Sequence, residues 1–170
     1  RQLCFWDIRI GSNPVILLKE LHSGDINTMD WSEANTNYLA TGSNDCLVKL
    51  LDLRKVFASI HADQKKEHPV VATLHEHTSK VQTVKFSPFN WKYLASTGEA
   101  IYFWNLEEAL PPQNSVLDLH QADPFLWLEN SKEYPETTRS IQCNSLNPNL
   151  VSTQEREGVL VLKHIGHIGQ

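Results

Sequence analysis

Cysteine and glycine are scarce in this 170-residue sequence, which holds three cysteines and seven glycines. Cys4, Cys46 and Cys143 are odd in number and lie far apart without a C-x-x-C spacing, so neither a disulfide framework nor a zinc site is indicated. No apolar run approaches the roughly 18 residues of a membrane-spanning helix, and the first ten residues lack the features of a signal peptide. The sequence therefore gives no sign of a structural metal or of a membrane anchor.

Motifs that carry catalysis are also missing. The sequence contains no G-x-S-x-G nucleophile elbow, no H-E-x-x-H zinc motif and no glycine-rich phosphate loop. Its eight histidines do not follow a ligand pattern, and the two in KHIGHIG near the C-terminus have no third ligand close by. We therefore expect no enzyme activity, no catalytic residues, no bound metal and no cofactor.

Positive charge is in short supply, because 15 Lys and Arg face 20 Asp and Glu, giving a formal net charge of -5. Such a chain is not expected to bind nucleic acid as a whole through counterion release. The negative charge is concentrated in residues 107–136, which hold seven carboxylates and one lysine. That segment carries a net charge of -6, so the rest of the chain is close to neutral.

What the sequence does contain is an internal repeat. Ile26 aligns with Val81 and Trp31 with Phe86 at a constant separation of 55 residues, and a weaker third copy begins at Ile141. Each copy alternates short apolar segments with turn residues such as Ser-Pro and Gly-Ser-Asn-Asp, which predicts β-strands. An apolar segment before each of the first two copies supplies a fourth strand. Such a sheet cannot bury both faces alone, so neighbouring units must stack to complete the core.

The third strand of each unit ends in a recurring pattern, namely FWDIR at 5–9, LLDLR at 50–54 and FWNLE at 103–107. With the repeat, these residues resemble the WD-repeat β-propeller family. The resemblance implies an all-β fold in which the chain forms about three blades of a seven-bladed ring, as a fragment of a longer protein. The expected divisions are the end of one blade at 1–10, blades at 14–54 and 69–106, an acidic insertion at 107–140 and a degenerate last blade at 141–165.

In well-formed repeats of that family, a buried hydrogen-bonded set joins a His before the first strand, a Ser or Thr on the second, an Asp in the next turn and the Trp. The resemblance assigns to this set His22, Ser43 and Asp45 in the first full repeat and His77, Thr97 and Trp104 in the second. Leu51 stands at the Trp position of the first repeat. A shorter turn in the second repeat puts Glu99 near the Asp position. A structural role is therefore expected for these histidines.

The acidic segment has two interpretations. Its carboxylates, its Pro-Pro turn and its apolar residues would suit a basic amphipathic helix, whose cations meet the carboxylates while its apolar anchors fill a groove. Alternatively, the segment is a linker whose PFLWL stretch, at 124–128, is one strand of a blade. The sequence weights the two interpretations equally.

The order of these features resembles more closely the C-terminal half of the retinoblastoma-binding, histone-binding WD-repeat proteins. In that subfamily a Pro-Pro loop and an N-terminal helix clasp a histone H4 helix. The partner-binding residues expected from the match and from the acidic and apolar pattern are Glu107, Glu108, Leu110, Pro111, Pro112, Asp118 and Trp127. The resemblance implies a nuclear scaffold, present also in the cytoplasm, that regulates transcription as a histone-binding subunit of a deacetylase or chromatin-assembly complex. Its partners would be proteins, with no direct contact to nucleic acid or membrane.

A rival interpretation uses Trp6-Asp7-Ile8-Arg9, which fits a Trp-Asp-x-Arg pattern by which some propellers dock onto the adaptor of a cullin-type ubiquitin ligase. The alternatives are therefore a substrate receptor of such a ligase and a generic WD-repeat scaffold. The pattern is short, and its Asp-x-Arg end also makes structural contacts within propellers, so the histone-binding interpretation is preferred.

Overall fold

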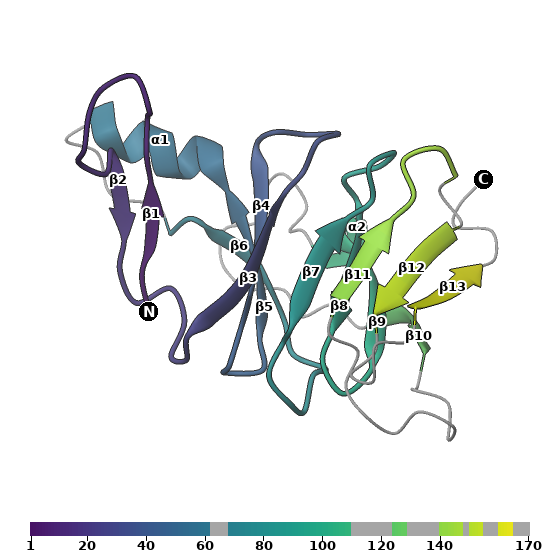
Figure 1. Ribbon diagram of the computed structural model, residues 1–170. Coiled ribbons are helices and arrows are strands. Elements are labelled where there is room, and N and C mark those ends of the chain that lie inside the picture. Colours follow the sequence, from purple (N-terminus) through teal and green to yellow (C-terminus); the bar gives the residue numbers. More distant parts are fainter. Residues whose placement is uncertain (62–67, 110–123, 129–139, 148–149, 155–159, 165–170) are drawn as a thin grey trace.

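The computed structural model describes residues 1–61, 68–109, 124–128, 140–147, 150–154 and 160–164. These residues form antiparallel β-sheets with two short helices. Four sheets stand side by side in the order of the chain (Figure 1). The architecture is the all-β, blade-like arrangement that the repeat predicts. In this part of the chain, no helix is long and apolar enough to cross a membrane.

The second and third sheets each have four strands. The first sheet pairs β1 (Leu3–Phe5) with β2 (Ile16–Leu18). The second has the order β3 (Ile26–Trp31), β4 (Tyr38–Ser43), β5 (Val48–Asp52), β6 (Val70–Leu74). The third has the order β7 (Thr83–Phe86), β8 (Tyr93–Thr97), β9 (Ile101–Asn105), β10 (Pro124–Leu128). The fourth consists of β11 (Ser140–Cys143), β12 (Leu150–Gln154) and β13 (Leu160–His164). Helix α1 (Leu53–His61) follows β5, and helix α2 (Leu106–Ala109) follows β9.

The sheets are offset from the sequence repeats. The strand that precedes each of the first two copies pairs with the sheet before it and not with the strands of its own copy. β2 pairs with β1, and β6 pairs with β5. The divisions at 14–54 and 69–106 therefore follow the repeat rather than the sheets. The segment 107–140, expected as an insertion whose PFLWL stretch is in one interpretation a strand of a blade, supplies β10, which pairs with β9 as the outer strand of the third sheet. Each connection between repeats thus joins two neighbouring sheets.

The main core lies between the second and third sheets. Val48, Leu50 and Leu74 of the second sheet are fully buried there with Val84 and Trp104 of the third. Smaller apolar clusters join the first sheet to the second and the third to the fourth. The sheets are held together mainly by the burial of apolar area between them. Each Å² of apolar surface removed from water contributes at most about 25 cal/mol of stabilising free energy.

Close packing between these sheets explains the glycine on β4. A Cβ atom at Gly42 would lie 2.5 Å from Val81 Cγ1 and 2.8 Å from Thr28 Cγ2, which is closer than real Cβ contacts. Val81 begins the next repeat, and its N–H donates to the carbonyl of Ser43 at 3.0 Å. The glycine therefore allows the second sheet to approach the chain that enters the third.

Candidate functional site

His22 is the centre of a buried hydrogen-bonded set in the second sheet. Its Nδ1 lies 3.0 Å from Asp45 Oδ2, and its Nε2 lies 2.9 Å from Thr41 Oγ1. Because a carboxylate only accepts, Nδ1 carries the hydrogen, and Nε2 of the neutral ring accepts from the threonine hydroxyl. Asp45 also accepts from the backbone N–H groups of Ser23 at 2.9 Å and Leu47 at 3.2 Å. The set therefore ties the entry of β3 to the turn after β4.

Ser43 lies beside this set but does not contact the histidine in it. As the last residue of β4, Ser43 instead accepts the N–H of Asp45 through its hydroxyl at 3.2 Å and so shapes the turn. The hydroxyl that contacts His22 belongs to Thr41, two residues earlier on the strand. The sequence placed the histidine and the carboxylate correctly together, and it missed the strand position of the hydroxyl.

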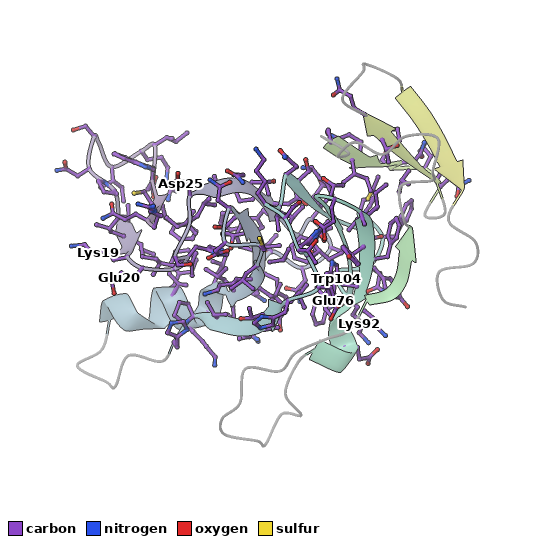
Figure 2. All side chains as sticks on the ribbon, turned by 90° about the horizontal axis from the view of Figure 1, so that it is seen from below. Lys19, Glu20, Asp25, Glu76, Lys92 and Trp104 are labelled. Atoms are coloured by element: carbon purple, nitrogen blue, oxygen red, sulfur yellow. The ribbon has the colours of Figure 1, made fainter. Side chains whose placement is uncertain are left out.

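His77 is the centre of the equivalent set in the third sheet. Trp104 Nε1 donates to Ser96 Oγ at 2.8 Å, and His77 Nε2 lies 2.7 Å from the same oxygen. Since Ser96 accepts from the indole, its own hydrogen points to Nε2, and the Nδ1–H of His77 faces Glu99 Oε2 at 3.3 Å. In Figure 2, Trp104 lies within the packed side chains of the third sheet.

Thr97 was expected to supply the hydroxyl of this set, but the structure places Ser96 there. Neighbouring residues of a strand point to opposite faces of the sheet, so Thr97 faces away from His77. The Thr97 hydroxyl is buried and has no hydrogen-bond partner within the described ranges. A signal in the sequence could have identified the right hydroxyl, because it lies 19 residues after the histidine in both repeats.

Glu99 takes the place of the aspartate in the third sheet. It accepts from the backbone N–H of Thr78 at 2.7 Å and of Ser79 at 3.1 Å, in addition to His77. These are the kinds of bond that Asp45 makes to Ser23 and His22. The extra methylene of glutamate spans the gap that the shorter turn leaves, so the set is complete with glutamate in place of aspartate.

The charges of these sets are fixed by their surroundings. Burial lowers the pKa of His22, so the ring is neutral at pH 7. Burial raises the pKa of Glu99, but hydrogen bonds from His77, Thr78 and Ser79 outweigh it, and the net pKa lies well below the usual range. The pKa of Asp45 is also lowered, because contacts with His22 and Leu47 outweigh the effect of burial. A neutral His22 beside an ionised Asp45 is suited to holding the turn in place.

The recurring strand ends have a second structural role. Asp52 accepts the N–H of Arg54 at 2.9 Å and its guanidinium Nη2 at 2.7 Å. Asn105 likewise accepts the N–H of Glu107 at 3.1 Å. A side chain that accepts an N–H two residues on, just before a helix, is an N-cap. The polar residue therefore ends β5 or β9 and begins α1 or α2.

Asp7 and Arg9 repeat the contacts of Asp52 and Arg54. Asp7 accepts the N–H of Arg9 at 2.9 Å and its Nη2 at 2.7 Å. These contacts account for the Asp-x-Arg pattern within the chain itself. The Trp-Asp-x-Arg pattern that suggested a ubiquitin-ligase adaptor therefore has a local structural role at Asp7 and Arg9.

The expected partner-binding residues begin on α2. Glu107 lies in α2 with a side chain that is 63% exposed, and its carboxylate accepts from Lys92 Nζ at 2.7 Å. Glu108 lies on the same helix. Trp127 lies on β10, where it pairs with Tyr102 in the register of the sheet. Four of the expected residues lie outside the described residues, namely Leu110, Pro111, Pro112 and Asp118. Within the described residues, no group of three or more His, Cys, Asp or Glu side chains could hold a metal ion.

Comparisons with known proteins match this geometry. A family model described as "WD domain, G-beta repeat" matches residues 15–52. The chain is 40% identical over 57 residues to the WD-40 repeat-containing protein MSI4 of Arabidopsis thaliana, a match that covers 34% of this chain and 11% of that protein. It is 28% identical over 121 residues to the transcriptional modulator WTM1 of Saccharomyces cerevisiae, covering 66% of this chain and 28% of that protein. The chain thus spans less than a third of the length of these relatives.

Solved structures share the fold at low sequence identity. A chain in the crystal structure of an active polycomb repressive complex 2 in the basal state superposes with a TM-score of 0.72 at 21% identity, covering 95% of this chain and 31% of that chain. The WD40 domain of Toxoplasma gondii coronin gives a TM-score of 0.62 at 19% identity, covering 85% of this chain and 32% of that chain. At these identities, the likeness shows the fold.

Proposed function

The chain belongs to the WD-repeat family, and we propose that it is a non-catalytic scaffold subunit of a chromatin complex, which binds a basic helix such as that of a histone. The observation that carries the proposal is the position of α2. This helix presents the exposed Glu107 and leads directly into the acidic segment. The chain's excess negative charge therefore begins at one defined place at the end of β9.

The sheets are suited to presenting such a segment. The buried sets around His22 and His77 hold the turns. α2 starts from a capped strand end, because Asn105 accepts the N–H of Glu107. A loop that leaves a rigid strand in this way is a common position for a binding site.

Lys92 sets a condition on the partner. Its ammonium lies 2.7 Å from Glu107, so a partner cation must compete with it or join a shared network. Both side chains are solvent-exposed in part, and exposed ion pairs contribute little free energy. We therefore expect Glu107 to be available to a partner that brings several cations.

The names of the relatives support the setting. WTM1 is described as a transcriptional modulator, and one solved neighbour belongs to a polycomb repressive complex 2. On this basis we place the protein in the nucleus, with a histone-binding role in a deacetylase or chromatin-assembly complex as the specific proposal. Its partners would be proteins.

The test is a binding titration of the full chain against a labelled peptide of the histone H4 N-terminal helix. Reversing Glu107 and Glu108 to Lys should weaken binding, chiefly by slowing association, and the effect should shrink as salt rises. Glu76→Lys is a matched control, because Glu76 is exposed and precedes β7, at the opposite end of the sheet from α2. Equal affinities of wild type and double variant at low salt would overturn the proposal.

A further inference from the structure

The loop between β7 and β8 carries an apolar side chain that is open to solvent. Phe89 lies in this loop and is 48% exposed. The third sheet packs on a neighbouring sheet on each side, so the exposure of Phe89 does not come from a missing neighbour. Trp91, two residues later, is partly buried, because its ring stacks on Tyr38 of the second sheet at a centroid distance of 4.5 Å and an interplanar angle of 9°. Trp91 therefore holds the loop, and Phe89 is left exposed.

The same loop is joined to α2. The carbonyl of Lys92 accepts the N–H of Leu106, the first residue of α2, at 2.7 Å. The ammonium of Lys92 lies 2.7 Å from Glu107, whose side chain is 63% exposed. Figure 1 shows the loop after β7 and α2 at the same end of the third sheet. Phe89 comes three residues before Lys92, so an exposed aromatic ring and an exposed carboxylate are held at one end of this sheet.

The corresponding loop of the fourth sheet also presents an apolar residue. Leu146 is 89% exposed and precedes Asn147, whose carbonyl accepts the N–H of Leu150 at 3.2 Å. In the third sheet, Asn90 makes the equivalent bond at 3.1 Å, and Phe89 precedes it. The two apolar residues therefore occupy the same position in neighbouring loops. Phe89 shows that this position stays exposed even where a further sheet follows.

A groove of about 140 Å³ lies between the two loops, at the ends of β3, β7 and β11. Pro88 and Ser145 both line it, and these residues come directly before Phe89 and Leu146. The groove therefore connects the two loops that carry the exposed apolar residues. We call Phe89, Leu146 and the groove between their loops the loop-tip surface.

The charges inside the groove favour a basic partner. Asp30 accepts the ammonium of Lys85 at 2.5 Å and the N–H of Phe86 at 2.8 Å. Asp30 and Lys85 therefore neutralise each other. Glu33 also lines the groove and is exposed, so it adds a carboxylate to that of Glu107 at this end of the sheets.

The second sheet does not combine these features. Its loop has Ala34 at the position of Phe89, since the carbonyl of the next residue accepts the equivalent N–H at 3.1 Å. Arg54 stands where the third sheet has Glu107, because each donates its N–H to the polar side chain two residues earlier. A basic amphipathic partner would meet a cation and a methyl group on the second sheet, but a carboxylate and an aromatic ring on the third.

We propose that the loop-tip surface holds the apolar face of the basic amphipathic helix that Glu107 attracts. This inference rests on the proposed function and adds where the apolar face of the partner lies. One apolar anchor of the helix packs on Phe89 and a second on Leu146, while its cations face Glu107. Packed sheets lie about 10 Å apart, and residues i and i+7 of a helix lie about 10.5 Å apart on one face. The two anchors are therefore expected one heptad apart.

The test compares two labelled peptides in titrations of the full chain. The first is the histone H4 helix peptide, and the second is the same peptide with its apolar residues replaced by serine. Phe89→Ala should weaken binding of the first peptide about three- to tenfold, chiefly through faster dissociation, because an anchor is lost. Leu146→Ala should weaken it about two- to threefold, because leucine buries less area than phenylalanine. Neither variant should change the affinity for the serine peptide.

Salt separates the apolar contacts from the charged ones. Rising salt should weaken binding of the H4 peptide in parallel for wild type and Phe89→Ala, because this substitution removes no charge. Reversing Glu107 and Glu108 to Lys should flatten the salt dependence. Leu17→Ala is the matched control, since Leu17 is 41% exposed on β2 of the first sheet, and it should bind like wild type. Thermal melting of each variant checks that it is folded.

Two outcomes would overturn the inference: wild-type affinity of Phe89→Ala and Leu146→Ala for the H4 peptide, or an equal loss of affinity for the serine peptide. The proposed function fails on a different measurement, namely unchanged affinity at low salt after reversal of Glu107 and Glu108. If the charge reversal weakens binding and the two alanine variants do not, the proposed function stands and the loop-tip surface is excluded.

Discussion

The second and third sheets hold the same turn with different residues. The second joins His22 to Asp45, while the third joins His77 to Glu99. The connection between the paired central strands is shorter in the third, where Leu94 pairs with Trp104, than in the second, where Leu39 pairs with Leu51. The longer acidic side chain compensates for the shorter connection.

The comparison separates what the fold requires from what it tolerates. Both sheets keep a carboxylate on Nδ1 of the histidine and a hydroxyl on Nε2. Only the third adds an indole, since Trp104 donates to Ser96, whereas Leu51 contributes apolar burial alone. The histidine and its two partners are thus the common element, and the tryptophan extends it in one sheet.

The largest expected effect is at Trp104. Trp104→Ala should cost about 3–5 kcal/mol of the free energy of unfolding, because it empties a fully buried site and removes a donor from Ser96. Trp104→Leu, which imitates the second sheet, should cost clearly less. Urea denaturation of both variants beside wild type measures the difference. Equal losses of unfolding free energy in Trp104→Ala and Trp104→Leu would mean that the side-chain volume at this position contributes little to stability.

The next effect concerns the two carboxylates. Asp45→Ala and Glu99→Ala should each cost about 1–3 kcal/mol, because each removes the acceptor for a buried histidine and for backbone N–H groups. The loss at Glu99 should be the smaller one, since its side chain is 27% exposed against 7% for Asp45.

Chemical denaturation also tests whether the length of the Glu99 side chain matters for stability. Glu99→Asp should recover only part of the loss seen in Glu99→Ala, because the shorter side chain does not span the shorter connection. Full recovery would show that length is irrelevant and that the compensation argument is wrong.

The sequence predicted the strands well because their pattern is local. Alternating apolar residues and turn residues located the strands of both full repeats. The repeat also named His22, Asp45 and His77 for the two sets and placed Glu99 near the Asp position of the second. The pairing of β2 with β1 and of β6 with β5 could not be read in this way. Strand pairing depends on which neighbouring sheet is in reach, and a repeat boundary carries no such information.

The hydroxyls show the same limit at the scale of one residue. Choosing Thr97 instead of Ser96 reverses the face of the sheet, because strand side chains alternate. The groove between β3, β7 and β11 was not predicted at all. Its residues come from segments far apart in the sequence, and only the stacking of three sheets brings them together.

A smaller effect concerns the pH dependence of stability that arises from His22. Burial lowers the pKa of His22 in the folded chain, so the unfolded chain binds more protons as pH falls below the ordinary value of 6.5. Stability should therefore be fully present above that value and decline as the pH falls from it through the lower pKa of the folded chain. Thermal melting of wild type and His22→Gln across this range should give a flatter slope for the variant, although the variant starts less stable.

His75→Gln is the matched control, because His75 lies at an exposed position between β6 and β7. It should leave the slope of the wild type in place. If His22→Gln kept the same slope as wild type, the neutral, buried state of His22 would be excluded as the origin of the pH dependence.

The smallest effect on the free energy of unfolding is expected at Thr97, which is next to Ser96 on β8. Its hydroxyl is buried without a partner in the described residues, so Thr97→Val removes an unsatisfied group and keeps the shape of the side chain. We expect a change within about 0.5 kcal/mol of zero, or a slight stabilisation. The neighbouring Ser96→Ala should instead cost about 1–3 kcal/mol, since Ser96 bonds both His77 and Trp104. Urea denaturation of Thr97→Val and Ser96→Ala beside wild type measures both changes. A loss above about 1 kcal/mol for Thr97→Val would mean that the Thr97 hydroxyl makes a stabilising hydrogen bond. The hydrogen bonds of β8 would then not be confined to the face that carries Ser96.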